Sequence, residues 1–271
     1  MQTNFSLKDK VIVVTGATGV LGEAFANGIA DAGGTVGILG RNEKVAAERT
    51  AGIINRGGKA IALIADVTNE QQLLSARGKI LEAFGKIDGL VNAAGGNMPE
   101  AVIQPEQDIF QLNIEALQQV MQANLFGSIL PTQIFGKVIQ NNGQGSIVNI
   151  SSITAQLAIT KVLGYSLAKA AIDNYTKWFA VELAKRYGDK IRMNAIAPGF
   201  FQTQQNKTLL TNPDGSLTDR GKLIIHKTPF TRFGQADELV GALVWLLSDA
   251  SNFVTGTIIK VDGGFSVYSG V

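Results

Sequence analysis

The sequence predicts an α/β fold built on a single Rossmann-type, doubly wound parallel sheet with helices on both faces. Short apolar runs alternate with helical patterns from one end of the chain to the other. The runs are apolar throughout, which is typical of strands covered by helices on both sides. A glycine-rich turn follows the first run. In such folds ligands bind beyond the carboxyl ends of the strands, so the segments that follow the strands are where a site is expected.

The strands are expected in seven segments, with helices between them. A helix is expected over 20–32, and longer ones around 116–140 and 164–187. Residues 96–115 and 200–230 interrupt the alternation, and both follow strand ends. We expect them to be substrate loops of a single domain that spans residues 1–271, because loops at this edge carry specificity. The expected strands are 10–16, 35–40, 60–66, 89–95, 145–152, 191–199 and 256–264.

Composition excludes several classes of function. The net charge is +2 and Lys and Arg form no runs, which argues against a nucleic-acid partner. The chain has no cysteine and one histidine, His226, so neither a disulfide nor a Cys- or His-rich metal site is expected, and we predict no metal. No apolar stretch approaches the roughly 20 residues of a membrane span, and the N-terminus lacks a signal-peptide core. We therefore expect a cytoplasmic protein with no membrane partner.

The stretch "TGATGVLG" places Gly16, Gly19 and Gly22 between the first strand and its helix. Glycines allow the backbone to turn tightly and approach a pyrophosphate, to which the helix N-terminus offers free N–H groups. The position after the first strand of an alternating α/β chain favours this interpretation over an ordinary tight turn. The turn predicts a dinucleotide cofactor.

The end of the second strand indicates which dinucleotide is bound. It reads "GILGRNEK", with no acidic residue on the strand and Arg41 directly after it. An acidic residue there would bind the 2′-hydroxyl of NAD, whereas an arginine accommodates a 2′-phosphate. The sequence therefore favours NADP(H), with NAD(H) as the alternative because Glu43 is close. Arg41 could also be an ordinary solvated charge at a helix start.

The stretch "GYSLAKAA" holds Tyr165 four residues before Lys169. Residues i and i+4 share one face of a helix, and a nearby cation lowers the pKa of a phenol from its usual value of about 10. We expect Lys169 to stabilise the Tyr165 phenolate. Tyr–Lys pairs at this spacing are also common on solvated helix faces, so a functional interpretation of this pair depends on the other motifs of the chain.

Together these motifs resemble the classical short-chain dehydrogenase/reductase family over essentially the whole chain. The markers, in chain order, are "TGATGVLG", Asp66-Val67, "NAAG" (92–95), Asn124, Ser152, Tyr165, Lys169, "PGFFQT" (198–203) and "DGG" (262–264). One departure is visible, because the family commonly spaces its glycines as TGxxxGxG and here Val20 takes the place of the middle glycine, after Gly19.

The resemblance implies a role for each catalytic residue and an oxidoreductase activity. Tyr165 would exchange the proton with the substrate oxygen, Lys169 would stabilise the phenolate, and Ser152 would donate a hydrogen bond to the same oxygen. Asn124 would hold a water that links Lys169 to solvent. The family also implies a homotetramer. The implied cofactor-binding residues are Gly16, Thr18, Gly19, Val20, Leu21, Gly22, Arg41, Asn42, Asp66, Val67, Asn92, Ala93, Ala94, Gly95, Tyr165, Lys169, Pro198, Gly199, Phe200 and Thr203.

Stretches such as "NAAGGNMP" and "VDGGFSVYSGV" are similar to the subgroup of D-mannonate oxidoreductases, which interconvert D-mannonate and D-fructuronate. A sugar-acid substrate implies a cation for its carboxylate, for which Lys161 is the first candidate and Arg192 and Lys207 are weaker ones. Lys161 could equally be a solvated loop lysine. The alternative substrates are another keto-sugar acid such as 5-ketogluconate, or a small ketone. The candidate substrate residues are Asn97, Ser152, Lys161, Tyr165, Gln204 and Asn206.

Two rival functions belong to other classes. "GYSLA" nearly matches the G-x-S-x-G nucleophile elbow of serine hydrolases, with Ser166 as the nucleophile and His226 as its base. That elbow requires a strand directly before it, and it leaves the glycine turn unexplained. A non-catalytic dinucleotide sensor would be expected to lose the serine, tyrosine or lysine, yet this chain keeps all three.

Overall fold

The computed structural model describes residues 5–104, 106–203 and 207–270. One sheet of seven strands runs through it in the order β3-β2-β1-β4-β5-β6-β7, and every strand pairs in parallel. The predicted doubly wound sheet is confirmed. The strands are β1 (Val11–Thr15), β2 (Thr35–Gly40), β3 (Lys59–Ile64), β4 (Gly89–Asn92), β5 (Gly145–Ile150), β6 (Ile191–Pro198) and β7 (Ile258–Val261).

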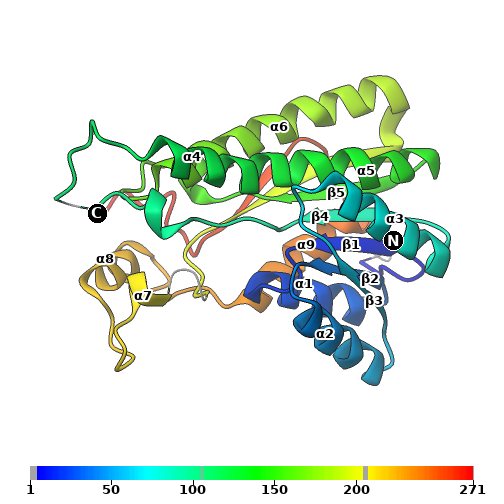
Figure 1. Cartoon of the computed structure of the whole chain (residues 1–271), viewed down its shortest axis with the longest axis horizontal. Coiled ribbons are helices and arrows are strands. Elements are labelled where there is room, and N and C mark those ends of the chain that lie inside the picture. The colour runs from blue at the N-terminus through cyan, green and yellow to red at the C-terminus, as the bar shows by residue number, and fades with distance from the viewer. Residues whose placement is uncertain (1–4, 105, 204–206, 271) are drawn as a thin grey trace.

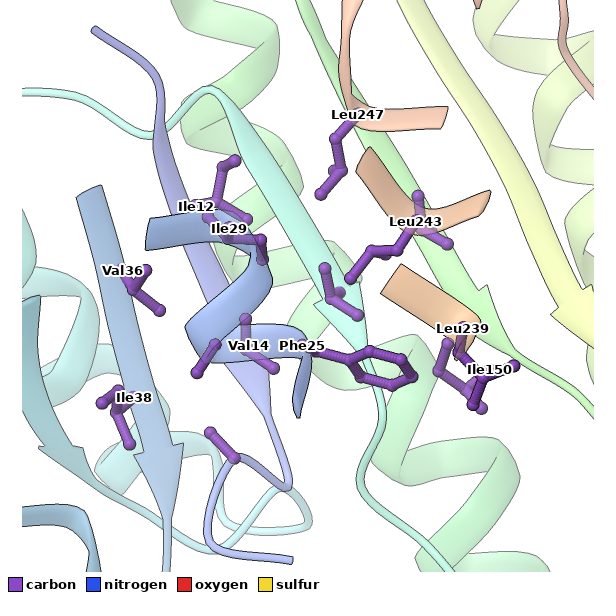
Figure 2. Packing of buried hydrophobic residues seen from close by; sticks show 14 of the residues in the cluster. Ile12, Val14, Phe25, Ile29, Val36, Ile38, Ile150, Leu239, Leu243 and Leu247 are labelled. Carbon is purple, nitrogen blue, oxygen red and sulfur yellow. The ribbon is translucent and has the colours of Figure 1, made fainter. Parts of the chain in front are cut away.

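Helices cover both faces of the sheet (Figure 1). One apolar core lies beneath α1 (Val20–Asp31), α2 (Glu43–Asn55) and α9 (Val240–Leu247). The other lies beneath α3 (Glu70–Phe84), α5 (Gly127–Asn141) and α6 (Leu163–Tyr187). Figure 2 shows the first core, where the ring of Phe25 from α1 points toward Leu239 and toward Ile150 at the end of β5. Burial on both faces explains why these strands are apolar throughout.

The helix expected around 116–140 is interrupted. It begins as α4 (Ile114–Met121), passes through a π-helical turn (Gln122–Phe126) and continues as α5. Such a bulge inserts an extra residue into the helical ladder and is frequent at functional sites. Here it contains Asn124, whose side chain is fully buried.

The two predicted loops contain short helices. A 3₁₀ turn (Pro99–Ala101) follows β4, and α7 (Lys207–Leu210) and α8 (Asp219–Lys227) follow β6. Figure 1 shows α7 and α8 set apart from the helix layers. Further 3₁₀ turns span Ile153–Ala155, Gly188–Lys190, Ala236–Leu239 and Asp249–Ser251. Among the described residues, no helix combines the length and apolar character that crossing a membrane requires.

Arg192 lies at the amino end of β6, the edge of the sheet opposite the expected site. Its guanidinium is buried and donates to the Ser248 carbonyl and the Ser251 hydroxyl, both at 3.0 Å. The Arg192 side chain therefore holds the turn after α9 against the sheet. The prediction that Arg192 could meet a substrate carboxylate is wrong, because a charged group that starts a strand cannot reach the carboxyl edge.

Candidate active site

Ser152, Tyr165 and Lys169 come together at the carboxyl end of β5. Ser152 follows the strand and caps the next 3₁₀ turn by accepting from the Thr154 N–H at 3.2 Å. Tyr165 and Lys169 lie on successive turns of α6, and the Tyr165 hydroxyl is hydrogen-bonded to Ser152. The Lys169 ammonium lies 5.4 Å from the centroid of the Tyr165 ring. The predicted spacing thus assembles one polar cluster.

The environment keeps Tyr165 protonated. Burial raises the pKa of Tyr165 to about 12, and the hydrogen bond to Ser152 only partly opposes this. Its ring packs in an apolar cluster with Met98 and Leu117. The Lys169 ammonium lies 5.4 Å from the ring centroid and donates to the Ile150 carbonyl at 2.7 Å, and its stabilisation of a Tyr165 phenolate stays a prediction. In this state Tyr165 is a proton donor.

Asp173 completes the cluster from one turn further along α6. Burial lowers the pKa of Lys169 to about 8, and the charge of Asp173 opposes that change. Asp173 is itself buried, accepting hydrogen bonds from the Ser151 hydroxyl and, at 3.1 Å, from the Gln156 amide. The sequence analysis missed Asp173, although its spacing of four residues after Lys169 was a visible signal.

Asn124 fastens the loop after β4 to the π-turn. Its amide donates to the carbonyls of Gly96 at 2.7 Å and Val120 at 2.8 Å, and its oxygen accepts from the Gly96 N–H at 3.0 Å. Gly95 has a φ of 140°, and a Cβ there would lie 2.4 Å from the Asn124 amide oxygen. Only glycine allows this close approach. Asn124 therefore positions the loop, and its role in a water relay stays a prediction.

The glycine turn has the shape that a pyrophosphate requires. Gly16 has a φ of 66°, and a Cβ there would lie 2.7 Å from the Ala93 carbonyl oxygen. A Cβ on Gly22 would lie 2.2 Å from the Gly16 carbonyl oxygen, so the turn packs tightly on α1. Gly19, the residue before α1, provides no side-chain cap, which leaves the N–H groups of Val20 and Leu21 available to an anion. These residues fit a nicotinamide dinucleotide, despite Val20 in place of the usual glycine.

Arg49, which the sequence analysis did not identify, supports the same turn from α2. Its guanidinium donates to the carbonyl oxygens of Ala17 and, at 2.9 Å, Gly19, and it pairs with Glu23 at 2.8 Å. Burial lowers the pKa of Arg49, while the charge of Glu23 raises it. Arg49 thus satisfies carbonyls that the turn leaves exposed. Because it lies about thirty residues from the turn, no local pattern could have indicated it.

Arg41, Asn42 and Asp66, three of the implied cofactor-binding residues, lie after β2 and β3. The exposed Arg41 places its guanidinium 3.5 Å from the Asp66 carboxylate, and Asn42 caps α2 by accepting from the Val45 N–H at 3.1 Å. Burial alone would raise the pKa of Asp66, but hydrogen bonds from Thr68 and the charge of Arg41 lower it overall. Arg41 and Asp66, predicted from separate motifs, therefore meet.

The remaining turn residues pack closely against neighbouring strands and helices. A Cβ on Gly40 would lie 2.5 Å from the Thr18 hydroxyl, so Thr18 sits against the end of β2. A Cβ on Gly127 would lie 2.8 Å from a methyl group of Val67, which places Val67 against α5. Thr18 and Val67 are thus each packed closely against a neighbouring element.

The "NAAG" motif connects the turn to the sheet. The N–H groups of Ala93 and Ala94 both donate to the Thr15 hydroxyl at 3.1 Å. Asn92 is buried, and its amide donates to the Thr132 hydroxyl at 2.9 Å and the Asn149 oxygen at 2.8 Å. The Asn92 side chain is thus turned into the fold and ties β4 to β5 and α5. Contact between Asn92 and the cofactor stays a prediction.

The segment after β6 packs against the segment after β7. Pro198 ends β6, and the Gly199 N–H donates to the Val261 carbonyl at 2.9 Å. The Phe200 ring lies edge-on to Phe265, with centroids 5.0 Å apart. Thr203 ends this described stretch. Pro198, Gly199 and Phe200, three of the implied cofactor-binding residues, are therefore held by the C-terminal segment.

The candidate substrate residues have unequal support. The Asn97 amide is buried with neither its nitrogen nor its oxygen hydrogen-bonded. Lys161 lies between Ser152 and Tyr165 in the chain and has a φ of 75°. Gln204 and Asn206 lie outside the described residues, as does the side chain of Lys207, the first residue of α7. Asn97 and Lys161 remain as candidates that the structure can describe.

The hydrolase interpretation is contradicted. Ser166 lies inside α6, its hydroxyl is buried, and the segment before it is the loop after the Ile153–Ala155 turn. A nucleophile elbow requires a strand directly before the serine and an exposed hydroxyl. His226 lies in the last turn of α8.

Comparison with known proteins agrees with this geometry. The family model described as enoyl-(acyl carrier protein) reductase matches residues 16–266. The chain is 42% identical over 275 residues to the uncharacterized oxidoreductase UxuB of Bacillus subtilis (strain 168), covering 98% of each. It is 33% identical over 263 residues to the gluconate 5-dehydrogenase of Gluconobacter oxydans (strain 621H), covering 97% of each.

Solved structures show the same similarity. A protein from Haemophilus influenza, provisionally named a D-mannonate oxidoreductase and holding bound NAD, superposes with a TM-score of 0.91 at 40% identity over 99% of both chains. A gluconate 5-dehydrogenase from Burkholderia cenocepacia J2315, in complex with NADP and tartrate, gives a TM-score of 0.86 at 32% identity over 98% of both chains. The chain is an oxidoreductase that belongs to the classical short-chain dehydrogenase/reductase family.

Proposed function

We propose that the protein interconverts a secondary alcohol and a ketone on a sugar acid, and that the pair is D-mannonate and D-fructuronate. The observation that carries the chemistry is the Tyr165 hydroxyl, hydrogen-bonded to Ser152 beside the buried Lys169. A nicotinamide dinucleotide supplies the hydride-transfer capacity that these side chains lack.

Each side chain has one task in ketone reduction. Tyr165, held protonated by burial, donates its proton to the carbonyl oxygen. Ser152 donates a hydrogen bond to the same oxygen as negative charge develops there. Lys169 is cationic below a pKa of about 8 and stabilises the phenolate that Tyr165 leaves. In alcohol oxidation the proton moves in the opposite direction.

Two observations support a polyhydroxylated acid as the substrate. Similar proteins carry the names D-mannonate oxidoreductase and gluconate 5-dehydrogenase. Asn97, next to Met98 in the cluster that holds the Tyr165 ring, has an unpaired buried amide. An unpaired buried polar group costs about 1–3 kcal/mol, and a substrate hydroxyl can pair with both its nitrogen and its oxygen. The gluconate 5-dehydrogenase relatives support 5-ketogluconate as the second candidate substrate.

We propose NADP(H) as the preferred cofactor. Arg41 lies directly after β2, where a 2′-phosphate is recognised in this fold, and its side chain is exposed. The neighbouring structures hold NAD in one case and NADP in another, so both cofactors belong in the assay. We also propose a cytoplasmic homotetramer, which the exposed apolar side chains of Leu167, Trp178 and Val181 on α6 support as a surface for a second copy.

The test is a spectrophotometric assay of the reduced cofactor with D-fructuronate, 5-ketogluconate and neutral ketones. We expect turnover of D-fructuronate, and a loss of about 10²–10⁴-fold in kcat for Tyr165→Phe, which removes the proton donor. Tyr187→Phe, at the exposed end of the same helix, is the matched control and should retain activity. Undiminished turnover by Tyr165→Phe would overturn the mechanism, and turnover of neutral substrates alone would overturn the sugar-acid assignment.

A further inference from the structure

Two cationic residues converge on the backbone of the connection between Ser152 and Tyr165. Lys161 lies in this connection, directly after Thr160. Arg220, near the start of α8, donates one hydrogen bond to the Thr160 hydroxyl and another to the Thr160 carbonyl, both at 3.2 Å. The segment after β6 therefore reaches across to the loop between Ser152 and Tyr165, and it places a guanidinium on Thr160, the residue next to Lys161.

Neither cation is neutralised by a carboxylate of the described chain. The described ion pairs include neither Lys161 nor Arg220, and the adjacent Asp219 pairs with Lys222 at 3.1 Å. Arg220 is half-buried, and that burial lowers the pKa of its guanidinium. Partial burial of a cation without a counter-charge is unfavourable, so the arrangement is suited to an anion supplied from outside.

The loop after β4 also holds the backbone at Lys161. Lys161 has a φ of 75°, a conformation that costs free energy in a residue other than glycine. Its carbonyl accepts from the N–H of Ile103, in the loop after β4, at 3.0 Å. Both predicted substrate loops therefore contact the Thr160–Lys161 segment, one through Ile103 and the other through Arg220.

Donors remain for a ligand. Arg220 uses two hydrogen bonds on Thr160, out of the five N–H donors of a guanidinium. The ammonium of Lys161 carries three donors. Charged donors of this kind bind carboxylates through short, strong hydrogen bonds.

We propose that Arg220 and Lys161 form the subsite that binds the carboxylate of the substrate. The proposal rests on the proposed function and assigns its acid specificity to two residues, one of which comes from α8. Ser152 and Tyr165, at the two ends of the same connection, hold the reacting oxygen, so the connection orients both ends of an elongated acid. Arg220 is a specificity-determining residue that acts on substrate binding.

The experiment compares a charged substrate with a neutral one of the same shape. D-fructose has a hydroxymethyl group where D-fructuronate has its carboxylate, so the KM ratio of the two isolates the contribution of the charge. For Arg220→Gln and Lys161→Gln we expect KM for D-fructuronate to rise about 10- to 100-fold, as for the loss of one charge-assisted hydrogen bond. We expect kcat for D-fructuronate and the kinetics on D-fructose to stay unchanged.

Lys222→Gln is the matched control, because Lys222 lies on the same helix and pairs with Asp219. An equal rise in KM for both substrates would overturn the proposal, since it would mean that Arg220 only braces the loop through Thr160. An unchanged KM for D-fructuronate would overturn it as well. Arg220→Lys keeps the charge and should restore part of the lost affinity, which separates loss of charge from misfolding.

A binding measurement separates this proposal from the proposed function. Tartrate is a hydroxylated dicarboxylate, and titration calorimetry of the cofactor-loaded protein measures its affinity without turnover. Weaker tartrate binding by Arg220→Gln and Lys161→Gln supports the subsite even if D-fructuronate proves not to be reduced. Equal tartrate binding by the wild type and both variants overturns the subsite, whichever sugar acid is the substrate.

Discussion

The role of each cation in this protein follows from the groups around it. Arg41 and Arg49 both lie near the expected cofactor site, one at the end of β2 and the other on α2. Arg41 is exposed and 3.5 Å from Asp66, whereas Arg49 is largely buried and bonded to two carbonyls of the glycine turn. The guanidinium of Arg41 is therefore accessible to a ligand phosphate from solvent, while Arg49 maintains the shape of the turn.

At the residue scale, this difference predicts the cofactor preference. Arg41→Ala removes the cation placed to bind a 2′-phosphate, so we expect KM for NADP(H) to rise about tenfold or more, with KM for NAD(H) little changed. Steady-state kinetics with both cofactors measures the ratio. Lys44→Ala is the control, because Lys44 is an exposed lysine on α2. If the ratio of the two KM values is unaltered in Arg41→Ala, the reason for favouring the phosphorylated cofactor disappears.

At the scale of the element, α6 carries three groups of the candidate active site on one face. Tyr165, Lys169 and Asp173 follow one another at intervals of four residues, so one helix sets all their separations. Hydrogen bonds from Ser151 and Gln156, which follow β5, also hold the Asp173 carboxylate in place. The proton donor, the cation and the counter-charge are thus fixed relative to one another by one rigid element.

This arrangement predicts a pH effect for Asp173→Asn. Lys169 is charged below its pKa of about 8, and Asp173 raises that pKa against the effect of burial. Without the carboxylate the pKa of Lys169 falls, so its charge is lost at a lower pH. We expect the alkaline decline of kcat/KM for ketone reduction to begin at lower pH in the variant, as a pH series of initial rates would show. Asp189→Asn, which removes an exposed carboxylate just beyond α6, should leave the profile in place.

A profile that keeps its position while kcat falls would mean that Asp173 only braces the helix. An electrostatic role of Asp173 requires that the pH profile of kcat/KM shift to lower pH in Asp173→Asn. Gln156→Ala removes one hydrogen bond to Asp173 but no charge, so it should affect stability more than the profile.

The pattern of apolar and polar residues along the chain predicted the helices and strands of this fold. It could not predict contacts between residues that are far apart in the sequence. Strand β2 occupies the expected residues 35–40, and the catalytic pair on α6 follows from spacing along one helix. The π-turn around Asn124 was not predicted, and the contact it makes, a hydrogen bond to Gly96 in the loop after β4, joins residues distant in sequence. Arg49 and Arg220 were missed for the same reason, because each acts on a backbone segment far from it in sequence.

At the scale of the whole molecule, the two edges of the sheet have separate tasks. The carboxyl edge holds Ser152, Tyr165 and the glycine turn, where close backbone approaches leave space for ligands. The amino edge is closed by polar contacts, among them Arg192 on the turn after α9 and Lys10 on Asp249. Side chains at the amino edge should therefore affect stability without affecting catalysis.

Arg192→Ala tests that separation. It removes a buried charged donor from the Ser248 carbonyl and the Ser251 hydroxyl, which should destabilise the fold by about 2–4 kcal/mol. For a chain of this size that lowers Tm by about 4–12 °C, measurable by calorimetry. At a temperature well below Tm, KM for sugar acid and cofactor should match the wild type. Arg186→Ala, which removes an exposed arginine paired with Glu182, should leave Tm nearly unchanged. If KM for the sugar acid alone rises in Arg192→Ala, Arg192 contributes to substrate binding. That result would contradict the separation of the sheet into a ligand-binding carboxyl edge and a structural amino edge.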